Sequence, residues 1–165
     1  MQIKVESREP ASAEADLLVL PLFALDPAHW KLPPRLVALE RALGGKLTAA
    51  LSSGDFRGKK AETLLVHGEA GACVRRVLLL GLGAESGVQA DGLRRAAGIA
   101  IGIAQGKRAT RVAFLVPALR RMRPPAQAQA LAEGAVLAGY RFDRYKTKRE
   151  EVPAAPLDAR HRLAG

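Results

Sequence analysis

The feature that most constrains the fold is an apolar run near the middle of the chain, Arg76–Gly83 (RVLLLGLG). Four consecutive apolar residues that end in Gly-x-Gly are typical of a central parallel strand that is buried on both faces. A helical pattern follows over about Asp91–Gln105, where apolar residues recur at helical spacing. A buried strand that leads directly into a helix indicates an α/β protein.

The same alternation of strand and helix patterns covers most of the chain. Further strands are predicted at Gln2–Glu6, Asp16–Phe23, Glu62–His67 and Arg111–Val116, and further helices from about Pro34 to Leu51, with a break at Gly44-Gly45, and from about Pro125 to Phe142. We expect Pro21 to mark the end of its strand, because proline has no amide hydrogen to donate. The right-handed crossover rule then makes several strand pairs parallel. The sequence therefore predicts a mixed, mostly parallel sheet with helices on its faces.

Two glycines inside the helix over about Asp91–Gln105 call for an explanation. Gly98 and Gly102 each cost about 1 kcal/mol relative to alanine in a helix. We expect the helix backbone to pack closely against the sheet or another helix at these two positions.

The length and the pattern predict one domain with a tail. A chain of 165 residues can bury roughly 70% of the surface that it exposes when unfolded. Residues 1–145 carry the predicted strands and helices, whereas 146–165 lack apolar periodicity and are interpreted as a linker or tail.

The sequence also bears on location and redox chemistry. The amino terminus has no apolar h-region, and no apolar run approaches the ~20 residues of a membrane span, so we expect a cytoplasmic protein without membrane contact. Cys73 is the only cysteine, which excludes an internal disulfide, and we interpret it as a buried, inert thiol.

The net charge of +10 is unevenly distributed along the chain. Residues 101–165 hold 13 Lys and Arg against 5 Asp and Glu, whereas residues 1–100 are nearly balanced. A basic surface of this kind attracts DNA or another polyanion, although cations at the end of a helix also complement its dipole. The possible polyanion contacts are Arg120, Arg121, Arg123, Arg141, Arg144, Lys146, Lys148 and Arg149.

One glycine-rich loop lies where α/β proteins bind phosphates. Gly81, Gly83 and Gly87 stand between the central strand and its helix, near strand ends and a helix amino terminus. Their spacing is not the dinucleotide fingerprint, so a tight structural turn is the main interpretation. A nucleotide site at these glycines is the alternative.

The residues do not indicate catalysis. His29, His67 and His161 are far apart in the sequence and show no metal-binding spacing. The carboxylates are scattered, and no Gly-x-Ser-x-Gly nucleophile motif occurs. We therefore predict no catalytic residue and no metal ligand in this chain.

Three segments resemble the amino-terminal domain of the leucyl aminopeptidase (cytosol aminopeptidase) family. They are SGDFRGKKAETLL at Ser53–Leu65, the strand and helix of Arg75–Gly106, and EGAVLAGYRFDRYKTK at Glu133–Lys148. The third is the most specific, because Tyr-Arg-Phe-x-x-Tyr-Lys is unusual after an alanine-rich helix. The resemblance covers about residues 1–148.

The resemblance implies a three-layer α/β/α, macro-domain-like fold and a non-catalytic role. In that family a larger carboxy-terminal domain follows and holds two divalent metals, zinc or manganese, with the catalytic residues. This chain is expected to lack that domain and to have no aminopeptidase activity by itself. The implied roles are assembly, substrate access or regulation, with that catalytic domain and further copies of the chain as partners, because the family is typically hexameric.

Two alternatives of other classes stay open. One is a stand-alone basic module that binds DNA or another polyanion, which the resemblance allows because some bacterial members bind DNA. The other is a nucleotide or ADP-ribose binder that uses the loop Gly81–Gly87.

Overall fold

The structure is a computed structural model that describes residues 2–26, 28–68, 73–140 and 161–164. Three helices of the 3₁₀ type, η1 to η3, cover Pro10–Ser12, Pro34–Leu36 and Glu85–Gly87, and the α-helices are α1 Val37–Ala42, α2 Lys46–Ser52, α3 Ala90–Gly106 and α4 Pro124–Gly139. The strands are β1 Ile3–Val5, β2 Leu17–Phe23, β3 Thr63–His67, β4 Arg76–Gly83, β5 Val112–Leu115 and β6 His161–Ala164. No helix of the described residues is long and apolar enough to cross a membrane.

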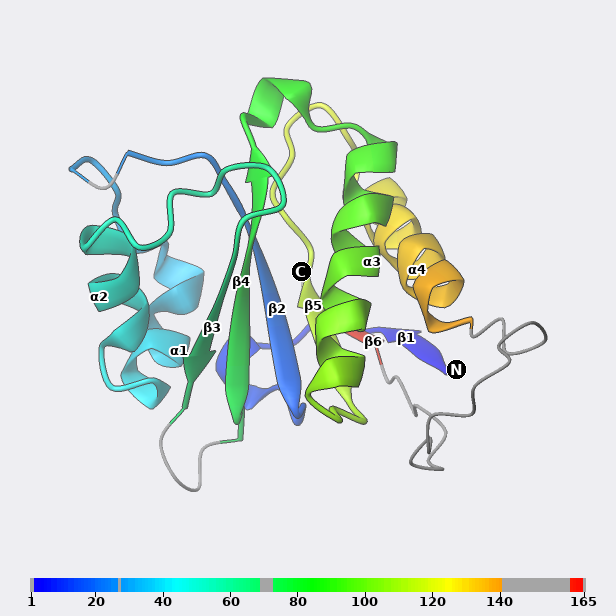
Figure 1. Cartoon of the computed structure of the whole chain (residues 1–165), viewed down its shortest axis with the longest axis horizontal. Coiled ribbons are helices and arrows are strands. Elements are labelled where there is room, and N and C mark those ends of the chain that lie inside the picture. The colour runs from blue at the N-terminus through cyan, green and yellow to red at the C-terminus, as the bar shows by residue number, and fades with distance from the viewer. Residues whose placement is uncertain (1, 27, 69–72, 141–160, 165) are drawn as a thin grey trace, which may run out of the picture.

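The strands form one mixed sheet in the order β1-β6-β5-β2-β4-β3. Every neighbouring pair is parallel except β3 and β4, which are antiparallel. The parallel strands β2, β4 and β5 lie next to one another, so their carboxyl ends meet at one edge of the sheet, at the top of Figure 1. The prediction of a mixed, mostly parallel sheet is confirmed.

Helices cover both faces of the sheet, and each face has its own apolar core. In Figure 1, α1 and α2 lie on one side of the sheet and α3 and α4 on the other. Along β2, Leu17 and Val19 pack into the core under α3 and α4, whereas Leu18 and Leu20 pack into the core under α1 and α2. This alternation explains why β2 is apolar at every position and confirms the predicted α/β/α layers.

Pro21 does not end its strand as predicted, since β2 continues to Phe23 and Pro21 pairs in register with Leu80 of β4. The sequence pattern could not show that β5 pairs with β2 only as far as Val19. At position 21, β5 therefore no longer lies beside β2. The missing amide hydrogen of Pro21 is tolerated there, because no hydrogen bond to β5 is needed.

The sequence predicts a linker or tail over residues 146–165, and the structure describes four of these residues. Residues 161–164 form β6, which lies between β1 and β5. Residues 146–160 and 165 are outside the described part of the chain. A four-residue strand is too short to carry a reliable period of two, so only the pairing with its neighbours identifies it.

The close packing between α3 and α4 does not occur at Gly98 or Gly102, the two positions that the sequence suggests. A Cβ atom at Gly102 would meet nothing within 4 Å, and one at Gly98 would make an ordinary contact with Ala138. The close approach is at Gly134 of α4, where a Cβ atom would lie 2.2 Å from the carbonyl oxygen of Arg94 in α3. An ion pair of 2.7 Å between Arg94 Nε and Glu133 Oε2 joins the same two helices.

Candidate ligand cavity beside helix α3

The loop of residues 57–62 covers the carboxyl end of β4. The Glu62 carboxylate accepts hydrogen bonds from the backbone amides of Arg57 at 3.0 Å and Lys59 at 2.8 Å. The Gly81 amide of β4 donates to the Glu62 carbonyl at 2.7 Å, and the Ala61 amide donates to the Gly81 carbonyl at 2.9 Å. These bonds hold the loop in one position against the strand.

Two glycines allow this close packing. Gly58 has a φ of +69°, which favours glycine, and a Cβ atom there would lie 2.1 Å from the Phe23 carbonyl oxygen. A Cβ atom at Gly81 would lie 1.9 Å from the carbonyl oxygen of Lys59. Because both obstacles are backbone atoms, no side-chain rotation relieves them. This geometry explains Gly58 in SGDFRGKKAETLL, the first of the three segments that carry the family resemblance.

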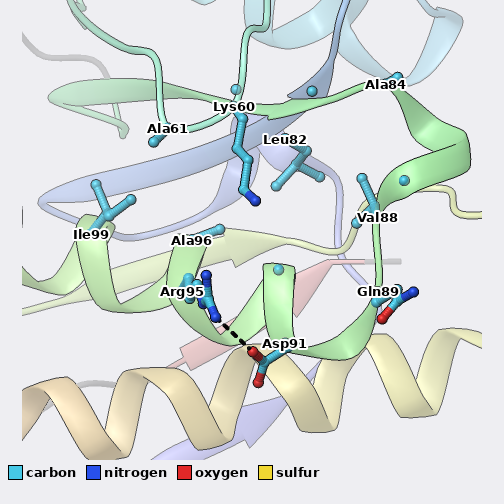
Figure 2. A pocket seen from close by; sticks show the side chains of 14 residues that line it. Lys60, Ala61, Leu82, Ala84, Val88, Gln89, Asp91, Arg95, Ala96 and Ile99 are labelled. Carbon is cyan, nitrogen blue, oxygen red and sulfur yellow. Dashed lines mark hydrogen bonds and ion pairs between the residues drawn. The ribbon is translucent and has the colours of Figure 1, made fainter.

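A cavity of about 660 Å³ lies between this loop, the end of β4 and the first three turns of α3 (Figure 2). Loops that follow strands at the carboxyl edge of an α/β sheet are common places for ligand binding. The residues that line the cavity are Lys60, Ala61, Gly81, Leu82, Gly83, Ala84, Gly87, Val88, Gln89, Asp91, Gly92, Arg95, Ala96 and Ile99.

The cavity has an apolar floor and a charged mouth. Leu82 and Ala96 are buried and Ile99 is partly buried, so the floor offers hydrocarbon surface. Lys60 extends from the loop toward α3, as Figure 2 shows, and makes no hydrogen bond or ion pair with any residue in the described part of the chain. Arg95 forms an ion pair of 3.2 Å with Asp91, one turn away on α3.

Gly81, Gly83 and Gly87, the alternative nucleotide site predicted from the sequence, all line this cavity. Gly81 has the structural role just described, inside β4 and not in a turn. Lys60 and Arg95 do not stand out as site residues in the sequence. Lys60 is 21 residues before Gly81, and only the antiparallel pairing of β3 with β4 brings its loop to this end of the sheet.

The first group of predicted polyanion contacts lies on the loop between β5 and α4. Arg120, Arg121 and Arg123 are all exposed. The Arg120 amide donates to Glu85 Oε1 at 3.2 Å, which connects this loop to η3 beside the cavity. The second group, Arg141, Arg144, Lys146, Lys148 and Arg149, is outside the described residues.

The described residues do not fit a metal ion. Among residues 2–26, 28–68 and 73–140, no group of three or more His, Cys, Asp or Glu residues converges. His29 instead pairs with Asp26 at 2.7 Å on the surface, and this hydrogen bond is the main reason why the pKa of Asp26 is lowered.

The interpretation of Cys73 as a buried thiol is wrong. Cys73 is exposed in the turn before β4. The sequence pattern could not show this, because the apolar run that becomes buried begins only at Val74.

Comparison with known proteins relates the chain to one family. The model of the N-terminal domain of the cytosol aminopeptidase family matches residues 19–149. A protein named probable cytosol aminopeptidase from Roseiflexus castenholzii is 35% identical over 168 residues, which cover 96% of this chain and 31% of that protein. The chain thus spans about a third of the length of this relative.

Solved structures support the fold. A tomato leucine aminopeptidase variant matches 92% of this chain and 31% of its own chain, with a TM-score of 0.75 and 23% identity. The macrodomain of Mycobacterium tuberculosis DarG matches 82% of this chain and 91% of its own, with a TM-score of 0.62 and 13% identity. The expected macro-domain-like architecture is confirmed.

Proposed function

This chain belongs to the cytosol aminopeptidase family as its N-terminal domain, and from this membership we propose that it is a non-catalytic accessory domain of a metal-dependent aminopeptidase. The observation that carries the proposal is the family match over residues 19–149, in a chain that spans about a third of the length of its relative. The proposed partner is the catalytic part that the longer relatives contain. The proposed location is the cytoplasm, in keeping with the name of the family.

The role that we propose for the domain is assembly, substrate access or regulation. Two-metal hydrolysis requires a converging set of ligands for two ions about 3.5–4 Å apart. Because no such set occurs in the described residues, we derive no step of peptide hydrolysis from this chain. Zinc or manganese would bind in the catalytic part.

The first experiment measures hydrolysis of leucine p-nitroanilide by the purified chain with manganese or zinc added. We expect no hydrolysis above the rate with metal alone, while a full-length cytosol aminopeptidase in the same buffer is active. Activity that increases with the concentration of the chain and disappears with a chelator would contradict the proposal.

A second experiment measures the intact mass of the native protein after antibody capture from its source cells. A product much heavier than 17.5 kDa would support an accessory domain joined to a catalytic part. A product of 17.5 kDa would contradict the covalent connection and favour a stand-alone role.

A second candidate function is binding of DNA or another polyanion. It is supported by the excess of cations in residues 101–165 and by the exposed side chains of Arg120, Arg121 and Arg123. Gel-shift titrations at two salt concentrations test it, since contacts with phosphates weaken as salt rises. We expect replacement of all three arginines with glutamine to weaken binding, and no shift at low salt would remove this candidate.

A further inference from the structure

We propose that the cavity beside α3 binds a small organic phosphate in which a planar, largely apolar group is joined to the phosphate, as in a nucleoside diphosphate. This binding function goes beyond the accessory role, and its experiment does not depend on aminopeptidase activity. It develops the sequence-based nucleotide hypothesis by placing the ligand against Lys60 and α3 instead of the glycines alone.

The size and lining of the cavity suit such a ligand. A volume of about 660 Å³ lies within the usual range of roughly 300–1,000 Å³ for small-molecule sites. Those sites combine apolar walls with a few polar groups that fix the orientation of the ligand. Here Leu82, Ala96 and Ile99 supply an apolar surface on which a planar group can lie.

The charges at the mouth favour an anion. The ammonium group of Lys60 has no partner among the described residues and extends toward the first turns of α3 (Figure 2). The one carboxylate of the lining, on Asp91, is already paired with Arg95 at 3.2 Å and with Arg94 at 3.7 Å. A phosphate near Lys60 therefore meets an unpaired cation and a carboxylate whose charge is neutralised.

The loop that carries Lys60 is rigid enough to position it. Its neighbours Lys59 and Ala61 both donate backbone hydrogen bonds, to Glu62 and to Gly81. Since the backbone on both sides is held, the Cα–Cβ bond of Lys60 keeps its direction toward the cavity, and the flexible side chain places its ammonium group at the mouth. A binding site held in place before the ligand arrives loses less entropy on binding.

The first test measures affinities by titration calorimetry with three probes, namely ADP, inorganic pyrophosphate and adenosine. We expect ADP to bind more tightly than either of the other two, because it alone uses both the floor and the mouth. Lys60→Gln should weaken ADP binding about tenfold, because it removes a charge-assisted hydrogen bond to the phosphate. The matched control is Lys59→Gln. It removes the same charge at the neighbouring position, where the side chain does not line the cavity, and should change the affinity for ADP by less than about twofold.

The second test fills the cavity without disturbing the fold. A Cβ atom at Gly92 would have Val88 Cγ1 at 4.0 Å as its nearest neighbour, so Gly92→Leu extends into the cavity from the first turn of α3. We expect this variant to lose ADP binding. Gly102→Leu is the control, because Gly102 lies on the same helix outside the cavity and has no neighbour within 4 Å of a Cβ atom.

Three results would overturn the proposal. The first is no heat with any of the probes at millimolar concentration. The second is an equal loss of affinity for the Lys59 and Lys60 variants, which would mean general attraction of anions. The third is full ADP binding by a folded Gly92→Leu variant, which would place the ligand elsewhere, with the three loop arginines as the next position to replace.

Discussion

The contact between α3 and α4 predicts a large effect from adding one methyl group, in the variant Gly134→Ala. A Cβ atom at position 134 would lie 2.2 Å from the carbonyl oxygen of Arg94 and 2.6 Å from its Cα atom, whereas ordinary contacts start at about 3.4 Å. The helices must therefore separate by about 1 Å, which forfeits a quarter to a half of the van der Waals attraction at each contact.

The magnitude follows from two opposing effects. Overpacking of a core costs typically 1–3 kcal/mol, and the upper end applies because both obstructing groups belong to a helix backbone and cannot rotate away. Alanine is more favourable than glycine in a helix by about 1 kcal/mol. We expect a net loss of about 2 kcal/mol in the free energy of unfolding.

Urea unfolding followed by circular dichroism measures this loss. With a slope of about 2 kcal/mol per molar urea, the unfolding midpoint of Gly134→Ala should fall by about 1 M. Gly102→Ala is the matched control on α3, where a Cβ atom meets nothing within 4 Å, and its midpoint should rise by up to about 0.5 M. The reasoning is refuted if Gly134→Ala unfolds at the same or higher urea concentration than the unmodified protein.

Three further predictions concern single side chains. Burial tends to raise the pKa of Asp16, but hydrogen bonds from the Thr110 hydroxyl and from the amides of residues 111 and 110 outweigh it and lower the pKa. Asp16→Asn should therefore lower the free energy of unfolding by about 1 kcal/mol at neutral pH. This difference from the unmodified protein, measured by urea titration, should shrink as the pH falls below about 4, the pKa of an unfolded aspartate. An unchanged difference at pH 3 would contradict the prediction. Glu62→Ala removes the acceptor of two backbone amides, so amide hydrogen exchange in the loop 57–62 should become faster while exchange in α4 does not change. The Cys73 thiol is exposed and should react completely with Ellman's reagent in the native protein, whereas a thiol that reacts only in urea would mean that it is buried.

Much of the cavity could not be predicted, because its walls come from segments that are distant in the sequence. The glycines at 81, 83 and 87 stand out as a group, since they follow a strong strand pattern. Lys60 is one of two adjacent lysines in a polar loop, and nothing in the nearby sequence distinguishes it from Lys59. The two differ only in the direction that the loop gives each side chain, which depends on the hydrogen bonds to Glu62 and Gly81.

The layers of this protein could be predicted from its sequence, because apolar periodicity and turn residues act locally along the chain. The family was indicated separately, by the three segments that resemble it. Continuous apolar runs specified β2 and β4 as strands buried on both faces, and the spacing of leucines and alanines specified the helices. Three features could be identified only in the folded protein. They are the glycine that packs against a neighbouring helix, the reason why Pro21 is tolerated within its strand, and the place of residues 161–164 in the sheet. Each of these depends on which strand or helix lies alongside, and that is a property of the assembled fold.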